Sequence, residues 1–305
     1  MGGTLRTAVL LAGLTALFGS VGLLLGGEGG MLIALVVAAG MNLWAWWRSD
    51  TAMLRLHNAE PISPHAAPRL YRMTEALASR AGLPMPALYV IRDPQPNAFA
   101  TGRSPEKGAV AVTSGLLDML TDDEVAGVIA HELAHIRNRD TLIMTVTATL
   151  AGAISLLAQF GFLFRDRDGR SNPLATIAMM IIAPLAAMLV QMAISRSREF
   201  QADRLGAEIA GNPRPLANAL LRLEAGHRGR IMRSAEAHPE TAHLFIVNPL
   251  SNLSFDGLFR THPKTADRVR ALLAMGDGAP ATPRAPSTGQ RATAPRPAVR
   301  NPWGR

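Results

Sequence analysis

Four long runs of residues without a charged side chain constrain this chain of 305 residues more than any other feature. They cover residues 7–27, 29–47, 141–164 and 171–195. Each run is close to or above the ~20 apolar residues that an α-helix needs to cross a hydrocarbon core of ~30 Å. The runs therefore predict two transmembrane hairpins, at residues 1–48 and 141–195.

Both hairpins have an alternative interpretation. Run 7–27 follows Arg6 and could belong to a signal peptide, but it is long for such a segment and a second run follows almost at once, which favours a retained hairpin. The pair 141–195 could instead form buried helices of a soluble domain, or a hairpin that enters the membrane without crossing it.

The arginines at the ends of the runs predict the orientation. Those that flank the hairpins on the side of the polar segments are Arg6, Arg48, Arg55, Arg137, Arg139, Arg196 and Arg198. The loop at 28 carries no positive charge, whereas the loop at 165–170 carries three arginines and weakens the asymmetry. Because basic residues stay on the cytoplasmic side, we expect both termini and the polar segments to be cytoplasmic.

Composition excludes several classes of site and partner. The chain has no cysteine, which excludes disulfides, thiol catalysis and every cysteine-based metal site. Its net charge of +8 includes five arginines in residues 281–305, a stretch without acids, so the first 280 residues carry only +3. We predict a disordered, basic, proline-rich tail at 277–305, and no nucleic-acid partner.

The polar segments predict a fold that is mainly α with a small β-sheet. Apolar residues at helical spacing predict a helix over 68–81. Short apolar stretches bounded by Pro, Gly and charges predict strands at 87–91 and 109–113, with a loop over 96–105 between them. Residues 196–276 are expected to be mostly helical.

The strongest chemical signal is His131-Glu132-Leu-Ala-His135. Thr121 and Glu124 form a capping box that predicts the start of its helix. Histidines at i and i+4 project from one helical face and can bind one Zn²⁺, with Glu132 placed as general base.

A third zinc ligand must come from elsewhere in the chain. Candidates are Glu199, Glu208, Glu224 and the remaining histidines. Glu199 and Asp203 share a helical face, so Glu199 could bind the metal while Asp203 orients a ligand histidine. The same pair is also compatible with ordinary surface ion pairs to Arg196 or Arg204.

Several motifs together resemble the HtpX family of membrane-bound zinc metalloproteases. They are the HELAH sequence, the four apolar runs, SRSREFQAD at 195–203, Thr261-His262-Pro263 and Asp267-Arg268-Val269. The resemblance covers residues 5–273. It implies a zincin-like metalloprotease domain, split into 49–140 and 196–276, assembled around the two hairpins.

The resemblance also implies roles for individual residues. His131, His135 and Glu199 would bind one Zn²⁺ per chain, Glu132 would be the general base, and Asp203 would hold a ligand. Asn97 and Ala98, with the strand at 109–113, would border the substrate groove. Lys264 stands where the family usually has a second proline.

Within this framework we predict Glu199 rather than Glu208 or Glu224 as the third ligand. Glu199 is the first acid after run 171–195, whereas Glu208 points to a face rotated by roughly 180° and Glu224 needs another helix. His262 could donate to the oxyanion or begin a helix. Arg268 is expected to pair with Asp203 or Glu199.

The remaining histidines have no partner spacing and are expected at the surface or at helix ends. They are His57, His65, His227, His238 and His243.

The expected function is a membrane-embedded zinc endopeptidase of the bacterial plasma (inner) membrane. It would cleave misfolded or damaged membrane proteins, or unfolded polypeptides, at cytoplasmic segments, with the lipid bilayer as its other partner. Run 141–164 begins six residues after His135, and run 171–195 ends four before Glu199, so the zinc would lie within about two helical turns of the bilayer. The alternatives are a transporter or scaffold with a structural zinc, and a dedicated prenyl-protein or propeptide processing peptidase.

Overall fold

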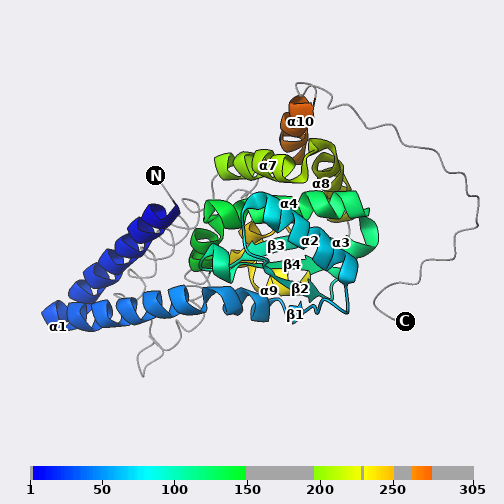
Figure 1. Cartoon of the computed structure of the whole chain (residues 1–305). Helices are drawn as coiled ribbons and strands as arrows, with labels where there is room; N and C mark the ends of the chain where they lie inside the picture. Colours follow the sequence, from blue (N-terminus) through cyan, green and yellow to red (C-terminus); the bar gives the residue numbers. More distant parts are fainter. Residues whose placement is uncertain (1–2, 149–195, 228–229, 251–262, 277–305) are drawn as a thin grey trace, which may run out of the picture.

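The computed structural model describes residues 3–148, 196–227, 230–250 and 263–276 (Figure 1). Its helices and strands are, in chain order, α1 (Gly3–Leu56), β1 (Glu60–Pro61), α2 (Pro68–Ala81), β2 (Ala87–Ile91), β3 (Ala98–Thr101), β4 (Ala109–Thr113), α3 (Ser114–Met119), α4 (Asp122–Asn138), α7 (Arg196–Ala210), α8 (Pro213–His227), α9 (Arg233–Ala237) and α10 (Thr265–Gly276). Short 3₁₀ helices occupy Pro105–Lys107 and Pro239–Leu244, and residues 140–148 are also helical. The predicted class, mainly helical with a small sheet, is confirmed.

Helix α2 and strands β2 and β4 have the bounds that the sequence predicts. Pro68 begins α2, where its missing N–H costs no helical hydrogen bond. Gly82 ends it with φ 66°, and its N–H bonds to the carbonyls of Ala78 and Ser79. These local signals are sufficient to predict the bounds of α2, because Pro68 and Gly82 meet the backbone requirements at its two ends without tertiary contacts.

The four strands form one mixed sheet in the order β1-β2-β4-β3. β2 and β4 are parallel, with Tyr89 opposite Ala111, and β3 is antiparallel to β4, with Phe99 opposite Ala111. β1 pairs antiparallel with β2.

The prediction of a loop over 96–105 is wrong for the central residues, because residues 98–101 form β3. β3 has only four residues and lies between turn residues, so the turn signals favour a loop, whereas β4, which is also fully buried, is a longer apolar stretch. The turn residues Pro96 and Gly102 mark the ends of this short strand. Gly102 has φ 139°, a backbone conformation that favours glycine.

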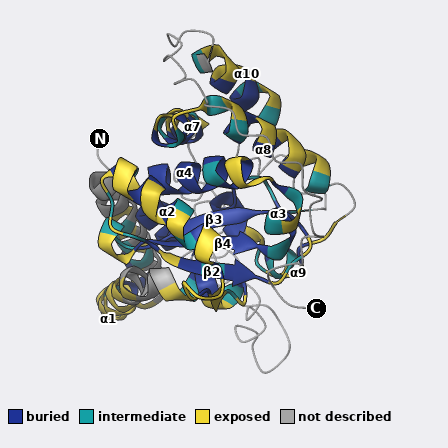
Figure 2. Ribbon diagram, turned by 45° about the vertical axis from the view of Figure 1, so that its right-hand side comes forward, coloured by how far each residue is buried: buried dark blue, intermediate teal, exposed yellow. Residues whose placement is uncertain are grey.

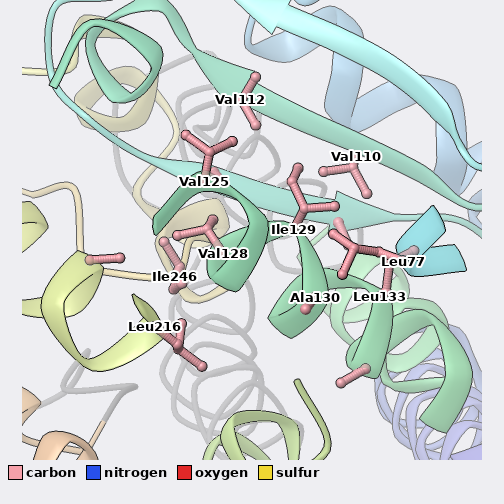
Figure 3. Close-up of a cluster of buried hydrophobic side chains, with 14 of the residues drawn as sticks. Leu77, Val110, Val112, Val125, Val128, Ile129, Ala130, Leu133, Leu216 and Ile246 are labelled. Carbon is pink, nitrogen blue, oxygen red and sulfur yellow. The ribbon is translucent and has the colours of Figure 1, made fainter. Parts of the chain in front are cut away.

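Helix α4 is the centre of the domain. It packs against β3 on one side and against α2, α7 and α8 on the others. In Figure 2 its ribbon is largely buried between the sheet and the outer helices. The core around it is drawn in Figure 3 and includes Leu77, Val110, Val112, Val125, Val128, Ile129, Leu133, Leu216 and Ile246. A central helix enclosed in this way has little freedom to shift, which favours a precisely held site.

Helix α1 consists of two arms that meet at Gly26 and Gly27, whose backbone angles are not helical. The arms extend from the domain in Figure 1. A Cβ on Gly22 would meet the Gly30 carbonyl and Ala34, so glycine allows the two arms to approach closely. The second arm continues to Leu56, and its Met53 packs in the domain core.

Among the described ranges, no helix is both long enough and apolar enough to cross a membrane. The four predicted spans and the domain boundaries drawn from them therefore stay predictions. Residues 149–195, which hold most of the second predicted hairpin, lie outside the described residues, as do His262 and the tail at 277–305.

Candidate metal centre

Helix α4 presents His131, Glu132 and His135 from its buried middle and end. The predicted capping box is confirmed at its start. The Thr121 N–H donates to Glu124 Oε2 at 2.9 Å, and Thr121 Oγ1 accepts from the Glu124 N–H at 3.4 Å. Reciprocal capping sets the first turn, and the helical period then places both histidines on one face.

Helix α7 crosses this face of α4 at close range because residue 206 is glycine. A Cβ at Gly206 would lie 2.9 Å from His131 Cα, and a real side chain has no room there. The close approach brings two buried acids of α7, Glu199 and Asp203, beside the histidines. A contact between the backbones thus determines which acids reach the site.

The ring nitrogens Nε2 of both histidines face Glu199. His131 Nε2 lies 3.2 Å from His135 Nε2. Glu199 Oε1 lies 3.5 Å from His135 Nε2, and Glu199 Oε2 lies 3.8 Å from His131 Nε2.

The ligand atoms of these three residues all lie within 4.8 Å of one another, and all three residues are buried. Two imidazoles and one carboxylate are the donor set of a catalytic zinc site that keeps one position open. The residues therefore fit one Zn²⁺.

Neither of the other acidic candidates joins this group. Glu208 is exposed and forms an ion pair with Arg204 at 3.2 Å, and Glu224 is exposed on α8. Glu199 is thus the acid that the fold brings to the histidines. The alternative interpretation of Glu199, as a member of a surface ion pair, is excluded because this residue is buried.

On the opposite side of the first histidine, His131 Nδ1 lies 3.0 Å from Asp203 Oδ1. Arg268 on α10 donates to both oxygens of Asp203, from Nη2 at 2.7 Å and from Nε at 2.8 Å. Its Nη1 also lies 3.5 Å from Glu199 Oε2. Arg268 was predicted to pair with Asp203 or Glu199; it forms its hydrogen bonds with Asp203 and also lies close to Glu199.

The second histidine has a carboxylate partner that sequence reasoning missed. His135 Nδ1 lies 3.3 Å from Asp140 Oδ2. The available signal was an acid just beyond the end of the helix, five residues after the histidine. Without the turn at Arg139, whose φ is 59°, nothing in the spacing directs Asp140 back to His135.

Glu132 is buried beside the ligands, and burial raises its pKa to about 7. Glu199 adds to the rise, while His135, Arg268 and an N–H donated by Ala100 of β3 oppose it. In the described part of the chain no hydrogen-bond partner faces Glu132 Oε1. A carboxyl with this pKa can both accept and return a proton near neutral pH.

The two histidines differ in charge when no metal is bound. Burial lowers the pKa of His131 to about 4, although Asp203 opposes the fall. Burial also lowers the pKa of His135, but the hydrogen bond to Asp140 and the charges of Glu199 and Glu132 outweigh it and raise the value to about 9. A metal ligand must be a neutral imidazole, so metal binding displaces a proton from His135.

Asn97 and Ala98 lie at the start of β3, where their polar groups bond to the chain itself. Ala98 O accepts from the Ile246 N–H at 3.0 Å. The Asn97 amide donates to the Val247 carbonyl at 2.9 Å. A role of these two residues in binding substrate stays a prediction.

Two of the remaining histidines are not where the sequence suggests. His57 is buried, packs edge-on against Phe99 and Phe245, and hydrogen-bonds to Ser234 and Thr241. The other is His243, which is buried and bonds to the Met144 carbonyl. The surface expectation fails for these two because long-range partners bond to their nitrogens. His65 is exposed, His238 caps α9, and the partly buried His227 ends α8, as expected.

The profile of peptidase family M48 matches residues 64–275. Among solved structures, the crystal structure of S. mikatae Ste24p is similar to this chain, with a TM-score of 0.49 and 19% sequence identity. The similarity covers 87% of this chain and 62% of that one. The range matched by the M48 profile, residues 64–275, begins before α2 and ends within α10. It therefore contains all the residues of the candidate centre.

Proposed function

Because the chain belongs to peptidase family M48, a family of zinc metallopeptidases, we propose that it is a zinc endopeptidase with His131, His135 and Glu199 as ligands. The observation that carries the proposal is the buried group of these three side chains beside Glu132. The sequence motifs support a finer assignment, to a subgroup of M48 that is similar to the HtpX proteases.

Each residue of the centre has its own role in the proposed reaction. Zinc, when bound, polarises a peptide carbonyl and makes water more acidic. Glu132 accepts the proton of the attacking water and returns it to the leaving amine, which suits a pKa of about 7. Asp203 holds His131 by Nδ1, so that Nε2 of this ring stays directed at the metal position.

The proposed substrates are misfolded or damaged membrane proteins and unfolded polypeptides, cut at cytoplasmic segments. Large apolar side chains that are exposed on α1 support a lipid environment, among them Leu32, Ile33, Val36 and Leu43. His135 lies six residues before the first apolar run of segment 141–195, and Glu199 lies four residues after the second, which supports a site close to the bilayer.

Proteolysis is tested with detergent-purified protein, using casein and a membrane-protein substrate with and without a chelator. Glu132→Gln should keep zinc but reduce cleavage by about 10²–10⁴-fold, since the ligands remain while the base is lost. Glu208→Gln is the matched control and should cleave like wild type. Folded wild-type protein without zinc would contradict the proposal. Zinc with no cleavage of any substrate would favour a structural metal in a transporter or scaffold.

The membrane orientation needs a separate test, for which a chain without cysteine is well suited. Cysteines at the exposed Asp123 and at Ser287 should resist a membrane-impermeant thiol reagent in intact cells and react after lysis. A cysteine at Gly29 should react in intact cells. Labelling of Asp123→Cys from outside would overturn the proposed cytoplasmic location.

A further inference from the structure

Each ligand histidine uses its two ring nitrogens for different partners. Both Nε2 atoms face Glu199, whereas Nδ1 of His131 lies 3.0 Å from Asp203 and Nδ1 of His135 lies 3.3 Å from Asp140. An imidazole that donates from Nδ1 to a carboxylate keeps Nε2 unprotonated and fixed in direction, as a metal ligand requires. Each ligand histidine thus has a carboxylate beside its Nδ1, and the two carboxylates come from different parts of the chain.

Asp140 occupies a particular place in the chain. It follows Arg139, the left-handed residue that ends α4, and it is the first residue of the helical stretch 140–148. Only 6% of it is exposed. Its other oxygen, Oδ1, lies 3.9 Å from Nε of Arg198, which is buried on α7 next to Glu199.

A simple helix-capping role does not account for this side chain. An aspartate at a helix start commonly accepts a backbone N–H two or three residues on. In the described part of the chain, no backbone N–H donates to the Asp140 carboxylate, which instead faces His135 and Arg198. Its contacts are therefore with the metal centre rather than with its own helix.

We infer that Asp140 is a positioning residue for the zinc ligand His135, and that Arg198 acts on the same ligand through Asp140. This inference rests on the proposed zinc site. Asp140 directly precedes the segment 141–195 and Arg198 follows it, so the pair joins the two ends of that segment at the metal centre. A displacement of either end then changes how His135 is held.

The first test measures zinc affinity by competition with a chromophoric chelator. Asp140→Ala should lower the affinity by about 10–100-fold, the usual effect of removing the partner of a ligand histidine. Asp140→Asn should lose less, because its amide oxygen still accepts from Nδ1. Asp123→Ala, an exposed aspartate of the same helix α4, is the matched control and should bind zinc like wild type.

The second test asks whether Arg198 acts through Asp140. Arg198→Met alone should weaken zinc binding by a smaller factor, and in the Asp140→Ala background it should add almost nothing. Independent, multiplying effects of the two substitutions would overturn the role assigned to Arg198.

A spectroscopic readout keeps the inference testable if Asp140→Ala folds poorly. In zinc-loaded wild type labelled with ¹⁵N-histidine, His135 should carry its proton on Nδ1, with a downfield shift that diminishes in Asp140→Asn. An unchanged signal, or wild-type zinc affinity in folded Asp140→Ala, would reject the inference while leaving the zinc site intact. A wild-type protein that binds no zinc would instead reject the proposed function.

Discussion

Arg268 on α10 and Asp203 on α7, 65 residues apart in the chain, form a two-point hydrogen-bonded ion pair that is almost completely buried. Burial raises the pKa of Asp203, but Arg268 and His131 outweigh it and lower the value to about 2. Asp203 is therefore ionised at every physiological pH, and its charge is available to hold His131. The guanidinium also balances part of the charge of Glu199.

Removing this arginine should destabilise the whole domain. Arg268→Met leaves the buried Asp203 without its partner, and breaking one side of a buried pair costs about 3–5 kcal/mol. The free energy of unfolding in urea measures the loss. Arg270→Met, two residues on, breaks only the exposed pair with Asp267 and should change stability by about 0–1 kcal/mol. Equal losses in the two variants would show that the buried pair has no special role.

The third ligand can be tested by metal content. Glu199→Ala should lower zinc affinity steeply, because one of three ligands is lost, and Asp203→Ala should lower it by roughly 10–100-fold. Glu208→Ala, the exposed acid on the same helix, should do neither. Zinc is quantified on folded protein after mild chelation, and full occupancy in Glu199→Ala would rule out this ligand.

Zinc binding should release a proton at neutral pH. His135 has a pKa near 9 without metal, so it is charged at pH 7, and only the neutral ring can bind zinc. Affinity should consequently rise with pH towards about 9, by up to about tenfold per unit, and then level off. Calorimetry in buffers of different ionisation enthalpy counts the proton. A count of zero at pH 7 would mean that His135 is already neutral.

The contact between α4 and α7 should not tolerate a methyl group. Gly206→Ala places a Cβ 2.9 Å from the His131 backbone, so α7 has to move away and carry Glu199 and Asp203 with it. We expect lower thermal stability together with weaker zinc binding. Gly40→Ala, where a Cβ meets nothing within 4 Å, serves as the control. Unchanged zinc binding in Gly206→Ala would indicate that the site does not depend on this approach.

Local signals were enough to predict four elements. The helical period predicted α2 and the helix that carries His131 and His135, and short apolar stretches bounded by Pro, Gly and charges predicted β2 and β4. Capping residues and the 3.6-residue period act over a few positions, so the capping box and the shared face of the two histidines can be derived from spacing alone. The same reasoning placed Glu199 and Asp203 on one face of their helix. It failed for β3, because this strand has only four residues and the turn residues on either side of it favour a loop.

The sequence by itself thus determined the chemistry of the site: two imidazoles, a neighbouring glutamate and a second helix that bears acids. With the family resemblance it also indicated Glu199 and Asp203, whereas only the tertiary structure revealed Asp140 and showed how these acids reach the histidines. The glycine at 206 lets α7 approach α4, the left-handed turn at Arg139 directs Asp140 back to His135, and α10 brings Arg268 to Asp203. These contacts join residues whose separation follows no period, because they depend on how helices pack rather than on how each one winds.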